Sequence, residues 1–256
     1  MIRRPPRSTL DRSSAASDVY KRQMKIEVLD SGFVEVIDSL GNDLTVVNSA
    51  RVSFGKRKTT YEEGDRKLVQ FLAKYKHYSP FRHMVVQFHI KAPEFVMRQW
   101  YKHVVGIETT SSSATKDHAW NEISGRYVPV KDFYKPLVWR QQSIDNKQGS
   151  GEDMPENLNN QCQEIFDNFM QNVEESYENL LKIGVAKEQA RTILPLNQYT
   201  EVYWTASFQA IMNFLELRTE KTAQWEIQQY AAAIKKLISD IYPETTDIWF
   251  NTHDLQ

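Results

Sequence analysis

Apolar and polar residues alternate along several stretches of the chain. Residues 26–28 and 34–36 alternate on either side of the turn-forming sequence at 30–32, and residues 86–90 alternate again. A period of two places successive side chains on opposite faces of a strand. The pattern therefore predicts a β-hairpin and a further strand, and we interpret residues 198–205 as a strand as well.

Other stretches repeat their apolar residues at helical spacing. Residues 68–75 do so, as do 208–218 and 223–241, and Pro93 opens a helix at a position where the missing N–H of proline costs nothing. The longest predicted helix ends at Gly184 and has a stripe formed by Cys162, Ile165, Phe166, Phe169, Val173, Tyr177 and Leu181. Such a stripe predicts an amphipathic helix with one face in the core.

The predicted strands and helices are segregated along the chain and do not form regular βαβ units. This order predicts an α+β fold, with a mixed or antiparallel sheet and long helices. No G-x-G-x-x-G follows a predicted strand, so a nicotinamide-binding Rossmann half is not supported. Residues 106–119 and 141–157 are polar and without a period, and we predict two loops there.

Composition narrows the class of protein. The chain has 256 residues, 41% of them hydrophobic, which suits a single globular domain over residues 24–256. No run of about eighteen apolar residues occurs, so no membrane span is predicted. The single cysteine, Cys162, excludes a disulfide framework and a thiolate metal cluster and indicates a reducing compartment, the cytoplasm. Its place on the apolar stripe predicts a small buried hydrophobic residue and not a catalyst.

Residues 1–23 differ from the rest of the chain. They carry six basic and two acidic residues, without a hydrophobic period or the apolar centre of a secretory signal. We interpret them as a translated cloning adaptor in preference to a targeting segment, with Met24 as the start. The remaining residues include 26 basic and 31 acidic ones. An anion site must then be a local cluster of Arg and Lys, and no global basic field points to nucleic acid.

Candidate chemistry first appears in the stretch NEISGRY. Glu122, Ser124 and Arg126 alternate there, so an extended or turning backbone would point them the same way. A serine hydroxyl, the Gly125 N–H and an arginine fork make a good phosphate cradle. As a nucleophile Ser124 lacks the G-x-S-x-G elbow and a histidine nearby in sequence. A phosphate ligand is therefore the favoured interpretation, and a structural turn is the second.

Further candidates lie on the predicted helices. The helix that Pro93 opens has two pairs of residues four apart, each on one face, namely Arg98 with Lys102 and Gln99 with His103. A solvated face is their ordinary interpretation, and the edge of a pocket is the alternative. Arg218 ends a helix and could simply satisfy its C-terminus, and Arg191 has the same ordinary interpretation. The six histidines show no H-x-x-x-H pair, so no metal site is predicted.

Several segments, taken together, resemble the flavin-dependent thymidylate synthase family. In order, they are MKIEVLDSGFVEVIDSLGNDL, HYSPFRHMVVQFHIKAPEFVMRQWYKH, NEISGRY, ARTILPLNQYTEVYWTASFQAIMNFLELR and AQWEIQQYA. The resemblance covers nearly all of residues 24–241. The R-Q-W, S-G-R-Y and N-F-L-x-L-R segments recur in the family in this arrangement.

The resemblance implies both a fold and an activity. The implied fold is an α+β homotetramer that binds FAD across subunits and has no nucleic-acid or membrane partner. The implied reaction converts dUMP to dTMP, with a methylene group from methylenetetrahydrofolate and reducing equivalents from NADPH through the flavin. No cysteine nucleophile takes part, which agrees with a chain that has only Cys162.

The resemblance also implies site residues. Arg218 matches an arginine that polarises the uracil ring and favours ionisation at N3, a role that suits a permanently charged guanidinium. The other matching dUMP positions are Gln99, Lys102, Glu122, Ser124, Gly125, Arg126 and Arg191. The matching FAD positions are Ser79, Lys102, His103, Glu122, Ser207, Gln209 and Asn213. His77 matches a histidine near the active site.

Three departures from the family pattern keep alternatives open. The usual Arg-His-Arg is Lys102-His103-Val104 here, which removes one guanidinium and replaces another by a point charge. Residues 106–119 lengthen the spacer before S-G-R-Y, and Thr222 replaces a histidine that many members have near the flavin.

A non-catalytic relative that binds nucleotide or flavin is therefore the first alternative. A single-strand-binding module is the second, suggested only by the aromatic and basic residues at 98–102. The mild acidity of the chain argues against the electropositive groove that such a module needs.

Overall fold

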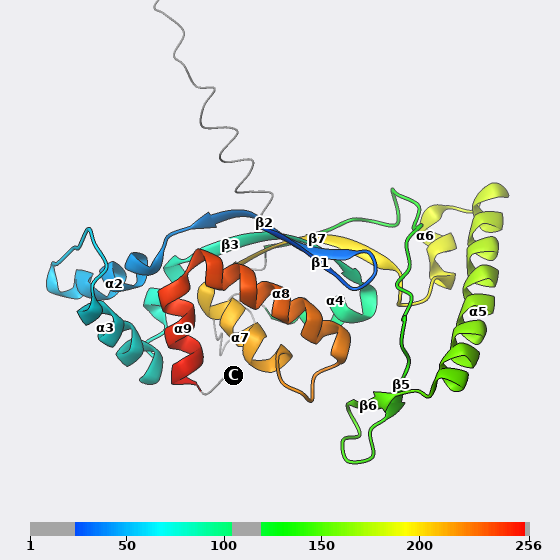
Figure 1. Ribbon diagram of the computed structural model, residues 1–256. Helices are drawn as coiled ribbons and strands as arrows, with labels where there is room; N and C mark the ends of the chain where they lie inside the picture. Colours follow the sequence, from blue (N-terminus) through cyan, green and yellow to red (C-terminus); the bar gives the residue numbers. More distant parts are fainter. Residues whose placement is uncertain (1–23, 104–118, 254–256) are drawn as a thin grey trace, which may run out of the picture.

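The computed structural model describes residues 24–103 and 119–253; the segment 1–23 and nearly all of the predicted loop at 106–119 lie outside that description. Its centre is a five-stranded antiparallel sheet in the order β1-β2-β3-β7-β4 (Figure 1). The strands are β1 (Lys25–Val28), β2 (Gly32–Leu40), β3 (Val85–Pro93), β4 (Ala119–Glu122) and β7 (Tyr199–Ser207). The predicted hairpin, the two further strands and the α+β class are confirmed.

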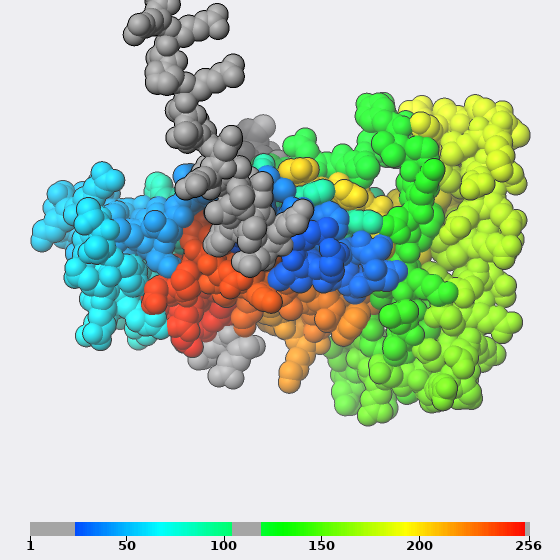
Figure 2. Space-filling view, turned by 45° about the horizontal axis from the view of Figure 1, so that its top comes forward, coloured from blue at the N-terminus to red at the C-terminus, as the bar shows by residue number. Residues whose placement is uncertain are grey.

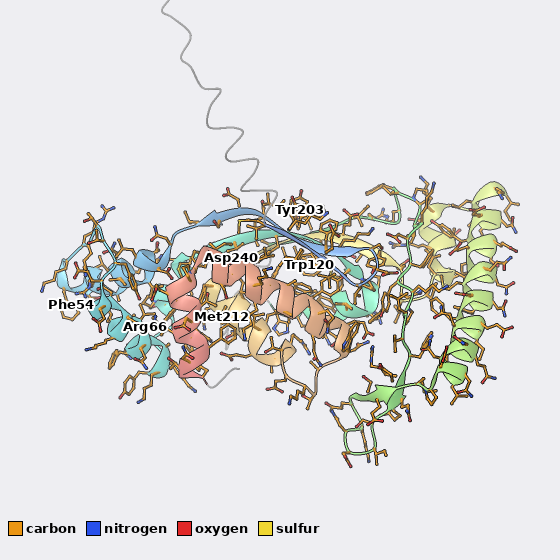
Figure 3. The ribbon with its side chains drawn as sticks, in the orientation of Figure 1. Phe54, Arg66, Trp120, Tyr203, Met212 and Asp240 are labelled. Atoms are coloured by element: carbon orange, nitrogen blue, oxygen red, sulfur yellow. The ribbon has the colours of Figure 1, made fainter. Side chains whose placement is uncertain are left out.

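One face of the sheet is apolar, and helices cover it. Alternate residues of β3 from Val86 to Ile90 are fully buried, whereas His89 between them lies on the other face and is partly exposed. The covering helices are α7 (Phe208–Arg218), α8 (Trp225–Ile241) and α9 (Pro243–Thr252) (Figure 1). Figure 3 shows Tyr203 of β7 on the open side of the sheet and Met212 of α7 on the covered side. The period-two pattern therefore reports which face meets the helices.

An aromatic cluster joins the sheet to α4 (Glu94–Trp100), the helix that follows Pro93 as predicted. The Trp100 ring stacks on Phe214 of α7, with 4.6 Å between ring centroids, and meets Trp204 of β7 edge-on at 5.6 Å. Trp100 is fully buried. It cannot stack on a nucleic-acid base, which removes the main support for a single-strand-binding module.

Several elements were not predicted from the sequence. They include β4, α2 (Asp43–Arg51), α9 and a short hairpin of β5 (Arg140–Gln142) and β6 (Ser150–Asp153). The hairpin, apart from Arg140, lies within the predicted loop at 141–157, and the last residues of that range already belong to α5 (Glu156–Lys182). All four residues of β6 are exposed, so no buried face gives this hairpin an alternating pattern.

The long helix α5 is confirmed, and so is the burial of Val173 and Tyr177 on its predicted stripe, but the burial predicted for the first half of the stripe is wrong for the single chain. Ile165 is 65% exposed and Phe169 is 53% exposed, and Cys162 is only partly buried. The helix packs on the short α6 (Lys187–Ala190) and η3 (Arg191–Ile193) instead of the sheet. Figure 2 shows α5 and α6 at one end of the molecule, beside the segment that leads to β5. Among the described helices, none combines the length and apolar character needed to span a membrane.

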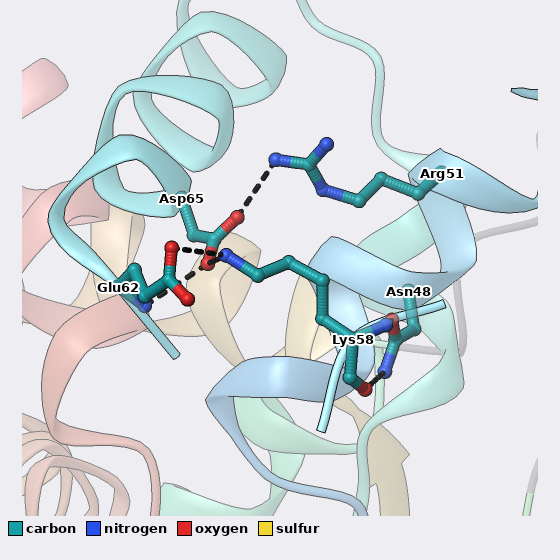
Figure 4. Close-up of polar contacts among 5 residues, drawn as sticks. All are labelled: Asn48, Arg51, Lys58, Glu62 and Asp65. Atoms are coloured by element: carbon teal, nitrogen blue, oxygen red, sulfur yellow. Dashed lines mark hydrogen bonds and ion pairs between the residues drawn. The ribbon is translucent and has the colours of Figure 1, made fainter. Parts of the chain in front are cut away.

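A buried ion cluster holds the opposite end of the molecule together (Figure 4). Asp65, in the first turn of α3 (Glu63–Lys74), is fully buried and accepts from the Arg51 guanidinium at 2.8 Å and the Lys58 ammonium at 2.5 Å. Asn48 of α2 bonds both backbone groups of Lys58. The cluster thus ties the loop after α2 to α3, and α2 in turn packs on η2 (Ser79–His83).

Candidate active site

A cavity of about 780 Å³ lies between α4, β4, the turn after β4 and the start of β7. Five of the predicted site residues line it, namely Lys102, Glu122, Ser124, Gly125 and Arg191. The cavity also has lining residues that sequence reasoning did not assign to a site, namely Glu94, Tyr101, Gln198 and Thr200, and it includes Arg98, for which the edge of a pocket was the alternative interpretation. The four-residue spacing of 94, 98 and 102 indicates that these residues act together, because it places all three on one face of α4.

The Ser124 turn has the geometry of an anion ligand. The Ser124 carbonyl accepts from the N–H groups of Tyr127 at 2.9 Å and Val128 at 3.1 Å, which closes the turn, and its Oγ accepts from the Arg126 N–H at 3.3 Å. The hydroxyl proton is left available to a ligand. No histidine is among the described residues that line the cavity, so none of them supplies the base that a serine nucleophile needs.

Gly125 allows Arg191 to approach the turn closely. A Cβ at position 125 would lie 3.3 Å from Arg191 Cδ and 3.9 Å from its Nη1. The absence of a side chain therefore leaves room for a guanidinium beside the Gly125 backbone. Arg191 lies on η3 between α6 and β7, so the pairing brings together residues 66 positions apart in the chain. Folding therefore places the Arg191 cation beside the predicted phosphate cradle, although the two are far apart in the sequence.

The cavity also contains two carboxylates. Glu122 accepts from the Thr200 hydroxyl at 2.7 Å. Burial raises the pKa of Glu94, and the nearby Glu122 carboxylate raises it further, while Arg98 and Gln198 act in the opposite direction. The Gln198 Oε1 atom is buried and has no hydrogen-bond partner among the described residues. Acceptors on one side and cations on the other suit a ligand that has both hydroxyl groups and a phosphate.

Glu94→Gln is expected to increase thermal stability at neutral pH and to lose this advantage in acid. Because folding raises the pKa of Glu94, the wild type loses stability as pH rises from the ordinary value of 4.5 through the folded value. Glutamine does not titrate, so removal of the buried charge and of its partly screened repulsion with Glu122 should raise Tm by roughly 2 °C at neutral pH. Thermal melts of both proteins across acidic and neutral buffers measure the difference.

The matched control is Glu152→Gln, which removes the same charge from the exposed strand β6. Equal melting behaviour of the two variants at every pH would contradict the proposed repulsion between Glu94 and Glu122.

A second group of predicted residues surrounds Arg218, at the end of α7. Its Nε donates to His103 Nε2 at 3.2 Å, and its Nη2 donates to the Gln99 carbonyl at 3.1 Å. Arg218 thus satisfies a carbonyl near the C-terminus of α4 and not one of its own helix. No carboxylate lies within ion-pair distance of it in the described part of the chain. Burial lowers the pKa of Arg218, because the charged form loses solvation. A bound anion would offset this loss.

His103 is neutral in this arrangement. Burial lowers its pKa to about 4, and the Arg218 charge contributes in the same direction. Because Nε2 accepts from Arg218, a hydrogen on the ring must be on Nδ1. The Gln99 side chain turns away and donates to Gln224 Oε1 at 2.6 Å. Of Gln99, Lys102 and His103, only Lys102 lines the cavity, together with Arg98 four residues earlier; Val104 lies outside the described residues.

A third group lies where η2 meets the beginning of α7. Ser79 is exposed on η2, Ser207 caps α7 by accepting from the Ala210 N–H at 3.3 Å, and Asn213 is exposed two turns along the same helix. Gln209 is nearly buried, and its Oε1 accepts from Arg82 Nε at 2.6 Å. Hydroxyl, amide and guanidinium groups are the donor set that a flavin dinucleotide needs for its phosphates and ring carbonyls, so this corner fits FAD. Sequence reasoning had missed Arg82.

The cavity of one copy of the chain does not include every predicted site residue. Neither Arg126 nor Arg218 is among the described residues that line the cavity. The Arg126 side chain is 55% exposed, and its Nε lies 3.8 Å from Glu188 on α6. His77 is exposed between α3 and η2, with its ring edge-on to Phe71 at 5.7 Å.

Comparison with known proteins identifies a match to one family over most of the chain. The family model described as thymidylate synthase complementing protein matches residues 35–244. Two relatives that share the description flavin-dependent thymidylate synthase come from Thermotoga neapolitana and Thermosipho melanesiensis. They are 43% and 41% identical over 223 residues, which cover 87% of this chain and 92% of each relative. A relative with the same description from Thermus thermophilus is 40% identical over 221 residues, 86% of this chain and 76% of its own.

Solved structures share the fold. The crystal structure of the UMP/dUMP methylase PolB from Streptomyces cacaoi with 5-Br dUMP superposes with a TM-score of 0.74 at 29% identity, covering 88% of this chain and 97% of its own. The structure of the same methylase with 5-Br UMP also superposes with a TM-score of 0.74, at 28% identity. The antiparallel sheet and helices described above are therefore those of this group of proteins.

Proposed function

Since this chain belongs to the flavin-dependent thymidylate synthase family, we propose that it reductively methylates dUMP to dTMP, with methylenetetrahydrofolate as carbon donor and NADPH-reduced FAD as reductant. The observation that carries the proposal is the cavity in which the Ser124–Gly125 turn, Arg191 and Lys102 are brought together. The structures of PolB with brominated dUMP and UMP support a pyrimidine nucleotide as the substrate class.

The cavity residues bind and orient the nucleotide in this proposal. The Ser124 hydroxyl, the Gly125 N–H and the guanidinium groups of Arg191 and Arg126 hold the phosphate, since a charge-assisted hydrogen bond from each is short and directional. Arg126 turns from its exposed position to complete the cradle. Glu122 accepts from the sugar, and Gln99 contributes to the nucleotide site.

Arg218 is the catalytic residue and acts on the pyrimidine ring. A guanidinium beside the ring stabilises negative charge that develops there and favours loss of the N3 proton. The neutral His103 and the Gln99 carbonyl fix its orientation. Because Arg218 is not among the described residues that line the cavity of one chain, we propose that a neighbouring subunit of a homotetramer supplies it. The exposed apolar residues of α5 support burial against another subunit.

The corner formed by η2 and α7 would hold FAD, through Ser79, Ser207, Gln209 and Asn213, with Lys102, His103 and Glu122 nearer the nucleotide. When bound, FAD carries the reducing equivalents of NADPH to the substrate. The chain's own residues orient the nucleotide and exclude water. No cysteine is required, since Cys162 lies on α5 and outside the described lining of the cavity.

Two measurements on the purified protein test the proposal. It should bind FAD and show a flavin absorption spectrum that changes when dUMP is added. It should also release tritium from dUMP labelled at C5 only when both methylenetetrahydrofolate and NADPH are present. A folded protein that stays colourless in excess FAD, and releases no tritium, would contradict the proposed function.

A non-catalytic relative is the second candidate, favoured by one observation. Lys102 lines the cavity as a point charge at a position where the family usually has an arginine. Such a protein would bind dUMP without turnover. Restoring both guanidinium groups, as Lys102→Arg with Val104→Arg, would then be expected to produce tritium release where the wild type has none. Turnover by the wild type dismisses this candidate.

Ser124→Ala is expected to weaken dUMP binding and to leave the chemical step largely intact. Loss of one hydrogen bond to a charged group should raise the Kd for dUMP roughly tenfold. Calorimetric titration with dUMP measures the affinity, and single-turnover tritium release at saturating dUMP measures the chemistry. Normal affinity combined with complete loss of tritium release would instead make Ser124 a nucleophile.

A further inference from the structure

We propose that Arg82 binds the phosphate chain of FAD, as a ligand additional to the flavin positions that the family resemblance implies. The inference rests on the proposed function, because it names a residue of the same cofactor site. Arg82 is exposed on η2, three residues after Ser79.

The contact with Gln209 fixes the orientation of the Arg82 guanidinium. Arg82 Nε donates to Gln209 Oε1 at 2.6 Å, and Gln209 is only 6% exposed in the first turn of α7. This hydrogen bond uses one of the five N–H donors of the Arg82 guanidinium. No other hydrogen bond of Arg82 is found among the described residues, so the edge formed by its two terminal nitrogens is available to a ligand.

Main-chain hydrogen bonds fix the backbone that follows Arg82. Met84 accepts from the Phe208 N–H at 2.8 Å, and Val85 pairs with Ser207, so η2 and the first turn of α7 are joined by main-chain bonds. Beneath them the rings of Phe81 and Phe208 stack at 6.0 Å, both fully buried. The Arg82 guanidinium, already oriented by this packing and by Gln209, loses little further conformational freedom when a ligand binds, which favours affinity.

Arg82 lacks the carboxylate partner that several other arginines of the chain have. Arg51, Arg66 and Arg140 each have a carboxylate partner, whereas no carboxylate is within 4 Å of Arg82 in residues 24–103 and 119–253. An oriented, unpaired guanidinium matches the bidentate geometry of a phosphate.

FAD is the occupant that the surroundings favour. Arg82 contacts Gln209 and neighbours Ser79 and Ser207, which are all implied flavin positions, while the nucleotide cavity has its own cations and does not include η2. The pyrophosphate is the charged part of FAD, so it is the part that an unpaired cation would bind.

Flavin titration of Arg82→Gln tests the inference without any assay of turnover. The Kd for FAD, measured by quenching of flavin fluorescence, should rise roughly tenfold, as expected for loss of a charge-assisted contact. Arg82→Lys should fall between the wild type and the glutamine variant, since it keeps the charge without the fork. The affinity for dUMP should stay unchanged in both. Riboflavin, which has no phosphate, should bind equally to the wild type and to both variants.

Arg57→Gln is the matched control, because it removes the same charge from an exposed arginine that has no hydrogen bond or ion pair among the described residues. A wild type that binds no FAD would overturn the proposed function. A wild type that binds FAD, with Arg82→Gln binding it equally well, would overturn only the role of Arg82. An equal loss of riboflavin and FAD affinity would also overturn it, because the contact would then be to the ring system.

Discussion

Arg218→Ala is expected to abolish methylation while the protein stays folded. The guanidinium is half-buried, has no carboxylate partner among the described residues and is fixed by His103 and the Gln99 carbonyl. Its remaining N–H groups can meet a pyrimidine ring, where a fixed positive charge stabilises the anionic form. Loss of such a group should lower kcat by about 10³-fold. Tritium release from C5-labelled dUMP measures the loss.

Separate controls distinguish chemistry from structure. Arg218→Lys keeps the charge but cannot donate to His103 and Gln99 together from a planar fork, so it should recover only part of the activity. Tm and the oligomeric state of Arg218→Ala should match those of the wild type, because its contacts are made at the end of a helix. Near-normal turnover by Arg218→Ala would disprove the catalytic assignment.

Much of the fold could be predicted because burial on one face repeats in the sequence. Residues 208–218 form α7 over the predicted range, the predicted strand at 86–90 lies within β3, and the predicted strand at 198–205 overlaps β7 from Tyr199 onward. The helix α2 was missed although its signal is local. Asn42 accepts from the Leu44 N–H, and Thr45 accepts from the Asn42 N–H, which is a capping pattern that the sequence alone displays. Only two of its residues are buried, so it has little apolar periodicity.

The helix α9 was missed for a different reason. Two of its buried residues are Thr245 and Thr246, which a pattern of apolar positions does not count. Thr246 is satisfied by a bond to the Ile238 carbonyl of α8, a contact visible only after folding. The stripe on α5 shows the opposite error, because apolar spacing predicts which face would be buried but not what covers it.

The candidate site was predicted best where its residues are contiguous. Glu122, Ser124 and Gly125 come from one short stretch and line one cavity. Arg82 and Gln209 are 127 residues apart, and no periodicity links them. The family resemblance implied that Gln209 and Arg218 are site residues. The contact between Arg82 and Gln209 is seen only in the folded structure. Long-range polar contacts of this kind have no local signature, since each partner alone is an ordinary polar residue in the sequence.

Asp65→Ala is expected to produce the largest loss of stability among single changes to charged residues. The Asp65 carboxylate is fully buried between Arg51, Lys58 and the Glu62 N–H (Figure 4). Burial opposes its ionisation, but the bonds from Lys58 and Arg51 outweigh it and hold the pKa of Asp65 below its ordinary value. Breaking a buried pair of this kind should cost about 3 kcal/mol. For a chain of this length the loss corresponds to a fall in Tm of roughly 8 °C.

Glu63→Ala is the matched control for Asp65→Ala. It removes the same charge from the same turn of α3, but Glu63 is exposed and makes no ion pair with a described residue. Since the folded pKa of Asp65 is lowered, its stabilising effect is present above the ordinary value of 3.8 and is lost as pH falls below it. The Tm difference between the wild type and Asp65→Ala should therefore shrink in acid, while that for Glu63→Ala stays small throughout. Equal Tm values for the two variants at neutral pH would show that the cluster contributes no net stability, and that α3 is held by its apolar face alone.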